Sequence, residues 1–393
     1  MRKITADKIY TISSKPFENM VLIADDAGKI LAIEPLDVHD PATVEHHVGV
    51  LVPGFVNTHC HLELSHMKGK VHTGTGLIPF IKGVVTQRHA PAEVIAAAIE
   101  QAEQDMLEAG IVALGDISNV PDTFEVKSRG RMRYHTFVEL FDFLQDTAAE
   151  KTFGDGSLVY EQLTLAPGSA RSMVPHAPYS VSKTLFKKIN AFNAETGITV
   201  SIHNQETPPE QALFLSKTGG FLDFYAGFGI SLDQFEATGQ TAIHYALAHL
   251  NPANRTLFVH NTLTSGPDIA AAQAWSPHVF WATCPNANLY IENNLPNYRA
   301  FLDANARVTL GTDSLTSNWQ LSILEEMKTI ARFQSYVPFE TMLQWATLNG
   351  AAALGFDDTL GSLEIGKTPG VVLLQGIAPD GTLQQTATAK RIL

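Results

Sequence analysis

Short apolar runs alternate with longer segments of helical periodicity over most of the chain, from residue 51 onward. Many of these runs are continuously apolar, which is typical of parallel strands that helices cover on both faces. Helical periodicity is clearest in residues 92–100 and 322–327. The pattern predicts eight strands, at residues 51–59, 111–117, 133–140, 172–176, 198–203, 255–260, 278–284 and 307–313.

The two ends of the chain follow a different pattern, in which short apolar runs are separated by turns. We expect strands there at residues 9–13, 21–24, 30–33 and 371–374. Asp25-Asp26-Ala27-Gly28 has the composition of a hairpin turn. We therefore expect residues 1–50 and 357–393 to form one small β-sandwich domain, beside a large domain formed by residues 51–356.

The large domain is expected to be a (β/α)8 TIM barrel, which makes the chain an α/β protein. Polar residues follow the carboxyl ends of several predicted strands, namely His59, His61, His176, His203, His260 and Asp313. In a closed barrel the first and eighth strands are neighbours, so these side chains can converge. In the alternative, a doubly wound open sheet, the first and last strands need not be neighbours, and the barrel is therefore favoured.

Composition narrows the classes of partner. The formal net charge is −13 and no basic stripe is present, which argues against nucleic acid or an anionic membrane as a partner. Cys60 and Cys284 make no disulfide framework and are expected to be small buried side chains. No segment approaches the roughly 20 apolar residues of a membrane span, and residues 1–8 are not followed by the apolar core of a signal peptide. We expect a cytoplasmic protein, monomeric or homo-oligomeric, that acts on a small molecule.

His59 and His61 form a His-x-His pair at the end of an apolar run. Side chains two residues apart on a strand face the same way, so the two imidazoles make half of a transition-metal site. His203 and Asp313 add a third nitrogen and a carboxylate oxygen, a set that suits Zn²⁺ or Fe²⁺ with a position left for water. Taken singly, His203 could be a core histidine and Asp313 a helix N-cap. Their joint position at strand ends predicts a metal site, for which Zn²⁺ is the first choice.

The fourth strand bears on the number of metal ions. A second metal would need a bridging carboxylate, commonly a modified lysine on this strand. Val174-Pro175-His176-Ala177-Pro178 contains no lysine. The sequence therefore predicts one divalent metal ion per chain.

Glu206 follows the proposed ligand His203 by three residues. If the chain turns into a loop there, this carboxyl can approach the reacting water without binding the metal. It could then move a proton between water and a substrate nitrogen. Pro208 and Pro209 follow at once and favour a defined loop, although an exposed loop residue is the alternative.

The segments that carry these residues resemble the amidohydrolase superfamily, in its adenosine- and cytosine-deaminating branch. The matching segments, in the family's order, are Pro53-Gly54-Phe55-Val56-Asn57-Thr58-His59-Cys60-His61, His203-Asn204-Gln205-Glu206, His260-Asn261-Thr262 and Gly311-Thr312-Asp313-Ser314. The resemblance implies that one divalent metal is held by His59, His61, His203 and Asp313. It further implies that Glu206 protonates a ring nitrogen, that His260 orients the attacking water, and that Asp313 accepts the water proton and passes it to the leaving amine.

Two further likenesses concern the substrate. His61-Leu62-Glu63-Leu64-Ser65 is similar to the first-strand loop of aminodeoxyfutalosine deaminases of menaquinone synthesis, and residues 175–180 and 284–288 are similar to segments of adenosylhomocysteine and methylthioadenosine deaminases. The resemblance implies a deaminase of a 6-aminopurine nucleoside, with Glu63 and His176 as contacts to the sugar or its 5′ substituent. Glu63 could instead be a solvated loop residue. Residues 77–80 could shape a pocket for the 5′ tail.

Two other functions fit much of the same pattern. One is a hydrolase of the same superfamily with another substrate, such as a chlorohydrolase or a guanine or cytosine deaminase. Glu206 together with His260 favours deamination, because an amine leaving group needs a proton. The other is a metal-free binding protein built on the barrel, which the presence of every expected ligand disfavours.

Overall fold

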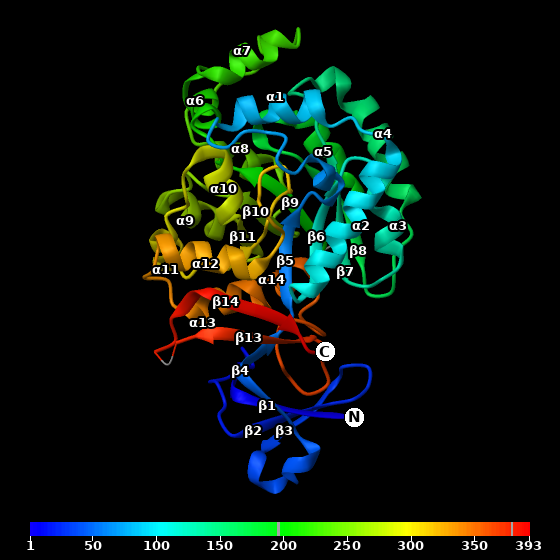
Figure 1. Cartoon of the computed structure of the whole chain (residues 1–393). Coiled ribbons are helices and arrows are strands. Elements are labelled where there is room, and N and C mark those ends of the chain that lie inside the picture. Colours follow the sequence, from blue (N-terminus) through cyan, green and yellow to red (C-terminus); the bar gives the residue numbers. More distant parts are fainter. Residues whose placement is uncertain (195–196, 379) are drawn as a thin grey trace.

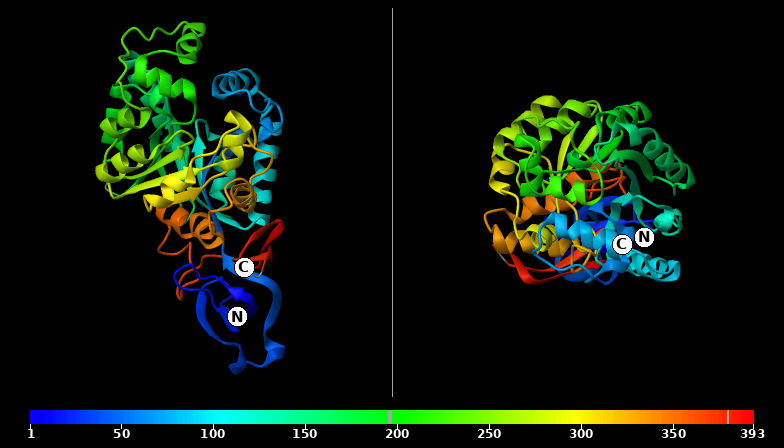
Figure 2. Two further views of the ribbon diagram at one scale, coloured as in Figure 1. Left: turned by 90° about the vertical axis from the view of Figure 1, so that its left-hand side faces the viewer. Right: turned by 90° about the horizontal axis from the view of Figure 1, so that it is seen from above.

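The structure is a computed structural model that describes residues 1–194, 197–378 and 380–393. The chain forms a helix-covered barrel and, at one end of it, a small β domain that both chain ends enter (Figure 1). A second view shows the same arrangement, and from above the helices surround the strands (Figure 2). The predicted α/β barrel with a small β domain is confirmed.

The barrel strands match the predicted apolar runs. They are β5 (Phe55–Cys60), β6 (Ile111–Ser118), β7 (Arg133–Leu140), β8 (Ala170–Pro175), β9 (Thr199–Asn204), β10 (Arg255–His260), β11 (Val279–Thr283) and β12 (Val308–Leu310). Parallel pairing gives two half-barrels, in the orders β5-β6-β7-β8 and β12-β11-β10-β9. The first predicted run, residues 51–59, differs because it is divided between two sheets at Gly54.

The two half-barrels meet near the carboxyl ends of their strands. On one side, the backbone N–H of His203 donates to the carbonyl oxygen of His176 at 2.9 Å. On the other side, the N–H of Thr312 donates to the carbonyl oxygen of His59 at 3.0 Å. Gly311 permits this second approach, since a Cβ there would lie 2.9 Å from the Cβ of His59. The first and eighth strands are thus neighbours, as the barrel requires.

Helices cover the barrel wall and its upper rim. The wall helices are α2 (Ala92–Glu108), α3 (Phe124–Ser128), α4 (Ala149–Gln162), α5 (Lys183–Phe192), α8 (Ala242–His249), α9 (Gly266–Trp275), α10 (Pro285–Glu292), α11 (Tyr298–Asp303), α12 (Ile323–Phe333), α13 (Phe339–Ala346) and α14 (Leu348–Leu354). Helices α1 (Leu77–Gln87), α6 (Pro208–Ser216) and α7 (Gly220–Gly227) lie above the strand ends (Figure 1). Of the two helical segments predicted most clearly, residues 92–100 lie within α2, and residues 322–327 begin at the N-cap of α12 and continue into it. None of the described helices has both the length and the apolar content that crossing a membrane requires.

The small domain is one continuous sheet in the described chain. Its strands are β1 (Arg2–Ile9), β2 (Met20–Ala24), β3 (Ile30–Pro35), β4 (Glu45–Pro53), β13 (Val371–Ile377) and β14 (Leu383–Arg391). They follow the order β14-β13-β4-β1-β2-β3, so the domain is built as a single sheet instead of two separate ones. Ile4, Leu22, Leu51 and Leu373 pack together in its core. The strand predicted at residues 9–13 is wrong, because β1 ends at Ile9 and residues 10–13 are not in a strand. The domain boundaries at residues 50 and 357 stay predictions.

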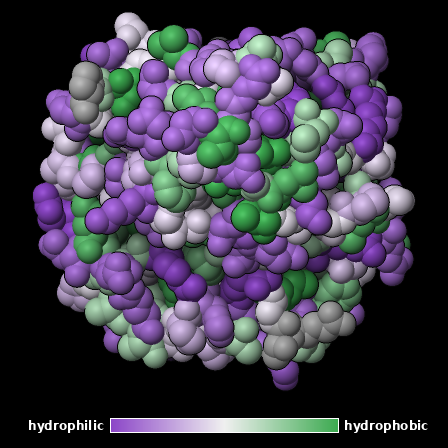
Figure 3. Space-filling model, turned by 90° about the horizontal axis from the view of Figure 1, so that it is seen from below, coloured by the Kyte–Doolittle hydropathy of each residue, from purple (hydrophilic) through white to green (hydrophobic). Residues whose placement is uncertain are grey.

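The lower face of the molecule lies on the far side of the small domain from the barrel mouth. Hydrophilic residues predominate on this face, and apolar residues form scattered patches among them (Figure 3). Val38, Val48 and Ile365 are exposed apolar residues of the chain-end segments. The converging polar residues lie at the opposite end, where the barrel strands finish.

Candidate active site

The two histidines of the His-x-His pair lie at the carboxyl end of β5. This strand is buried along its whole length, and Cys60 between them packs into the apolar core. His59 is completely buried, and His61 follows the last residue of the strand. The alternation of side chains along an extended segment therefore places both imidazoles together at the barrel mouth.

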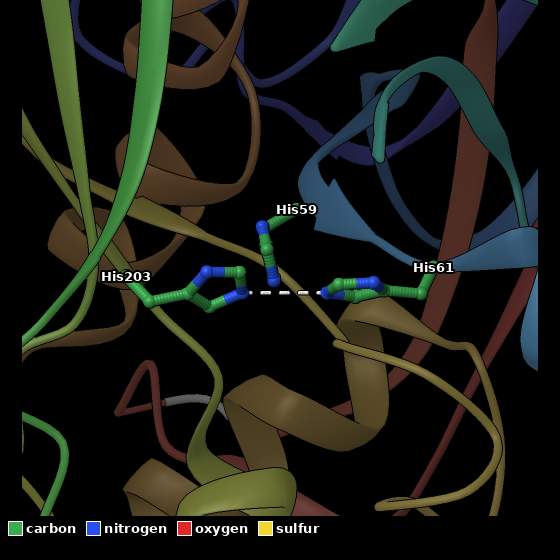
Figure 4. Close-up of side chains that lie close together, drawn as sticks. All are labelled: His59, His61 and His203. Atoms are coloured by element: carbon green, nitrogen blue, oxygen red, sulfur yellow. Dashed lines mark hydrogen bonds between the residues drawn. The ribbon is translucent and has the colours of Figure 1, made fainter. Parts of the chain in front are cut away.

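Three imidazoles and one carboxylate meet at this point. The Nε2 atoms of His61 and His203 lie 3.3 Å apart, with His59 beside them (Figure 4). Oδ1 of Asp313 lies 3.5 Å from Nε2 of His59 and 3.4 Å from Nε2 of His61. Among the described residues, neither ring nitrogen of the buried His59 has a hydrogen-bond partner. A buried polar atom without a partner is costly, and a divalent cation shared by these three nitrogens and one oxygen removes that cost, so the residues fit a metal ion.

Neighbouring groups orient the proposed ligands. Nδ1 of His203 donates to the carbonyl oxygen of His176 at 2.7 Å, which leaves Nε2 free to bind a metal. The hydroxyl of Ser317 donates to Oδ2 of Asp313 at 2.5 Å. Asp313 has a φ of 57° and is followed by a loop, and the next helix takes Ser322 as its N-cap. Asp313 is therefore not a helix N-cap.

The protonation states of the cluster suit metal binding. Burial lowers the pKa of His61 to about 3, and burial also lowers the pKa of His203 well below its ordinary value. Burial by itself would raise the pKa of Asp313, but the nearby imidazoles of His59 and His61 bring it below its ordinary value. Neutral imidazoles and an ionised carboxylate are the forms that ligate a divalent cation.

Glu206 lies in a buried loop beside this cluster, not in an exposed one. Its backbone N–H donates to Oε2 of Glu210 at 2.9 Å, and the preceding Gln205 has a φ of 46°. Oε1 of Glu206 lies 3.6 Å from Nε2 of His260, while Nδ1 of His260 donates to Oδ1 of Asn288 at 3.0 Å. Burial raises the pKa of Glu206 well above its ordinary value. This carboxyl can therefore hold a proton at neutral pH.

These residues open into a cavity of about 150 Å³. Its polar lining consists of His61, Arg88, Asn119, Glu139, His176, Tyr179, His203, Glu206, His260, Asp313 and Ser314. The predicted substrate contact His176 is thus at the cavity, where its Nδ1 lies 2.7 Å from the hydroxyl oxygen of Ser180. A set of proton-bearing and metal-binding groups around one cavity is the arrangement of an active site.

Glu63 lies outside the lining of this cavity in the described chain. It is buried in the short 3-10 turn Leu62–Met67 and is therefore not a solvated loop residue. Its Oε2 accepts from the backbone N–H groups of Asn119 and Val120, at 3.0 and 3.3 Å. Its Oε1 lies 3.4 Å from Nη2 of Arg88. The role of Glu63 as a sugar contact stays a prediction.

Two strand-end carboxylates at the site were missed by the sequence reasoning. Glu139 near the end of β7 accepts from Nδ2 of Asn119 at 3.1 Å, and its Oε1 lies 3.5 Å from Nδ1 of His203. Asp116 on β6 accepts from the backbone N–H of Leu62 at 2.8 Å, which holds the segment after His61. Both carboxylates could have been identified by the criterion that identified His203, namely a polar residue near the carboxyl end of a barrel strand.

Known proteins resemble this chain in sequence and in fold. Over 378 residues it is 26% identical to the 5-methylthioadenosine/S-adenosylhomocysteine deaminase of Saccharophagus degradans. The matched region covers 89% of this chain and 77% of that relative. Its fold is similar to that of Helicobacter pylori aminofutalosine deaminase in complex with methylthio-coformycin, with a TM-score of 0.78 and 22% identity over 95% of this chain and 92% of that one.

A third similar structure is the zinc complex of atrazine chlorohydrolase from Arthrobacter aurescens. Its TM-score is 0.76 at 18% identity, over 95% of this chain and 86% of that one. The two solved structures show the fold that the chain shares with them. The sequence itself matches the amidohydrolase family over residues 50–389, which include every proposed metal ligand. This chain therefore belongs to the amidohydrolase family.

Proposed function

We propose that this chain is a metal-dependent hydrolytic deaminase that converts a 6-aminopurine nucleoside with a modified 5′ position to its 6-oxo product and ammonia. The observation that carries the proposal is the pair formed by Glu206 and His260, whose side chains lie 3.6 Å apart in the cavity that His61, His203 and Asp313 also line. Deamination needs a proton donor for the ring and one for the leaving amine. The deaminase relatives support the same reaction.

The ligand set consists of His59, His61, His203 and Asp313, and we propose one Zn²⁺, with Fe²⁺ as the alternative. Bound there, such an ion would lower the pKa of a water molecule toward 7 and supply a nucleophile at neutral pH. Neutral imidazoles and a carboxylate bind both Zn²⁺ and Fe²⁺, so the chemistry of the ligands does not distinguish the two metals.

The protein groups then divide the proton transfers between them. His260 faces the ligand set and orients the attacking water, and Asp313 accepts its proton. Glu206, which burial keeps protonated, donates to the ring nitrogen beside the attacked carbon. As the C6–N bond breaks, Asp313 passes its proton to the amine, which leaves as ammonia. The hydroxyl group on C6 returns a proton to Glu206 as the 6-oxo group forms. C6 of adenine fits this scheme because it carries an amino group next to a ring nitrogen that can be protonated.

The order of the proposed substrates follows from the sequence of the first-strand loop, residues 61–65, which is similar to that of aminodeoxyfutalosine deaminases. Aminodeoxyfutalosine comes first, followed by adenosylhomocysteine and methylthioadenosine. The fold shared with aminofutalosine deaminase and the sequence shared with the methylthioadenosine and adenosylhomocysteine deaminase support members of this group. The fold shared with atrazine chlorohydrolase supports the alternative, a hydrolase with another leaving group.

A substrate panel tests the proposed function. The metal-loaded enzyme is incubated with each adenine nucleoside, and with guanine, cytosine and a chlorotriazine. We expect loss of the adenine absorbance together with release of one ammonia per nucleoside, and the highest kcat/KM for a 5′-modified adenine nucleoside. If guanine, cytosine or the chlorotriazine has a higher kcat/KM than every adenosine derivative, the substrate assignment is wrong.

Replacing Glu63 by glutamine tests the proposed sugar contact. A carboxylate can accept two hydrogen bonds from a ribose diol, whereas a carboxamide offers one acceptor oxygen. We expect Glu63→Gln to raise KM for nucleosides by about tenfold, since a hydrogen bond to a charged group contributes about 1.5–3 kcal/mol. The KM for free adenine should change far less. The control is Glu93→Gln, an exposed position on α2, and equal effects on nucleoside and base would rule out the sugar contact.

A further inference from the structure

One wall of the cavity is a single face of α1. Its lining residues are Leu77, Phe80, Ile81, Val84 and Val85. They recur at the spacing of one helix face, and Arg88, three residues beyond Val85, continues this face into the same cavity. Val85 stays exposed, although an apolar helix face is normally buried against the protein. The wall is therefore apolar along its length and cationic at its end.

Arg88 is well placed to bind an anion. Among the described residues that line the cavity, it is the single lysine or arginine. Its side chain is 33% exposed, and its contact with Glu63 is long, at 3.4 Å. The two backbone N–H groups that Glu63 accepts both bond to its Oε2, and Arg88 contacts its Oε1 through one N–H of Nη2. A guanidinium has five N–H donors, and most of those of Arg88 are left for a ligand.

The base of the cavity carries carboxyl groups of its own. Glu139, Glu206 and Asp313 line it there, and the whole chain carries a formal net charge of −13. At the other end of the cavity, Arg88 is the cationic side chain that can hold a ligand carboxylate, because a guanidinium binds a carboxylate through two parallel hydrogen bonds.

We propose that the α1 wall is the subsite for the 5′ tail of the substrate, and that it selects an apolar spacer ending in a carboxylate, which Arg88 binds. This inference rests on the proposed function, within which it distinguishes the substrates. Aminodeoxyfutalosine has such a tail, with an aromatic ring between the ribose and the carboxylate. Methylthioadenosine has an apolar tail and no anion. The tail of adenosylhomocysteine also carries an ammonium group, for which the apolar wall offers no acceptor.

The test measures equilibrium binding, so that it does not depend on turnover. Calorimetric Kd values for aminodeoxyfutalosine and methylthioadenosine are determined on the metal-loaded Glu206→Gln protein, with Arg88 intact or changed to methionine. We expect Arg88→Met to weaken binding of the carboxylate ligand by about 10- to 100-fold, the range of a charge-assisted hydrogen bond. Binding of methylthioadenosine should change by less than about twofold, and Arg88→Lys should restore part of the lost affinity.

Lys82→Met is the matched control, because Lys82 is an exposed cation of the same helix that does not line the cavity. It should leave both Kd values unchanged. The inference is overturned if Arg88→Met weakens both ligands equally, if it weakens neither, or if the protein with Arg88 intact binds neither ligand. Binding that depends on Arg88 in a wild-type protein that releases no ammonia would refute the proposed function and retain the subsite. If the wild-type protein deaminates the substrate but binding does not depend on Arg88, the proposed function stands and the subsite is refuted.

Discussion

Glu206→Gln is expected to lower kcat by about 10²- to 10⁴-fold, the usual contribution of a general acid–base group, while the metal content stays unchanged. Glutamine has nearly the same shape and retains an acceptor oxygen, but it cannot give up a proton to the substrate. Glu206 lies beside His260, outside the proposed ligand set, so the metal does not depend on it. Activity and elemental analysis of the same preparation test both parts, and near-normal turnover would remove Glu206 from the mechanism.

Glu210→Gln provides the matched control. Glu210 is also a buried carboxyl and accepts the backbone N–H of Glu206, but it does not line the cavity in the described chain. We expect it to lower kcat much less than Glu206→Gln does. The pH profile gives a second measurement. Because burial raises the pKa of Glu206, the acid form persists through neutral pH and kcat/KM falls as pH rises through that pKa. This alkaline decline should be absent in Glu206→Gln.

His203→Ala is expected to abolish most of the activity and to remove most of the metal. The change deletes one of three nitrogen ligands and leaves a buried pocket in which His61 and Asp313 face a gap. Elemental analysis should give one divalent metal per wild-type chain and a small fraction of that in the variant. His176→Ala is the control, since His176 lines the same cavity without belonging to the proposed ligands and should keep the metal.

Two results would contradict the metal assignment. One is two metal ions per wild-type chain, which would require a bridging group that the fourth strand does not offer. The other is a His203→Ala variant with full metal content and normal turnover. Expression with added metal excludes trivial loss during purification, and a wild-type chain that still contains none would favour a metal-free binding protein.

The fold could be predicted wherever an apolar run coincides with one strand, as it does from β6 to β11. At residues 51–59 it does not. The run is continuous in the sequence, yet β4 ends at Pro53 and β5 begins at Phe55. Gly54 allows the chain to pass between the sheets, since a Cβ there would lie 2.3 Å from Val112 and 2.7 Å from the carbonyl oxygen of Pro369. Val112 and Pro369 are distant from Gly54 in the sequence, and hydrophobic periodicity carries no information about such long-range contacts.

The edge strand β14 escaped prediction for a related reason. Most of its residues are exposed, with Leu383 and Ala387 as the buried positions, so its apolar signal is weak. The strand ends of the barrel behave in the opposite way. Histidines and an aspartate that interrupt apolar runs stand out, and the structure brings these residues together. Arg88 gives no such signal, because its place in the cavity depends on how α1 lies across the barrel mouth.

The pairing of β4 with β13 affects the order in which the protein can assemble during synthesis. Val371 of β13 lies opposite Pro53 of β4 in this antiparallel pair, and the whole barrel is made between the two strands. A growing chain therefore carries β4 without its β13 partner until the whole barrel has been synthesised. An unpaired strand edge is a template for pairing with other chains. β13 covers this edge of β4 once the barrel between the two strands has been made, and β14 extends the sheet beyond it.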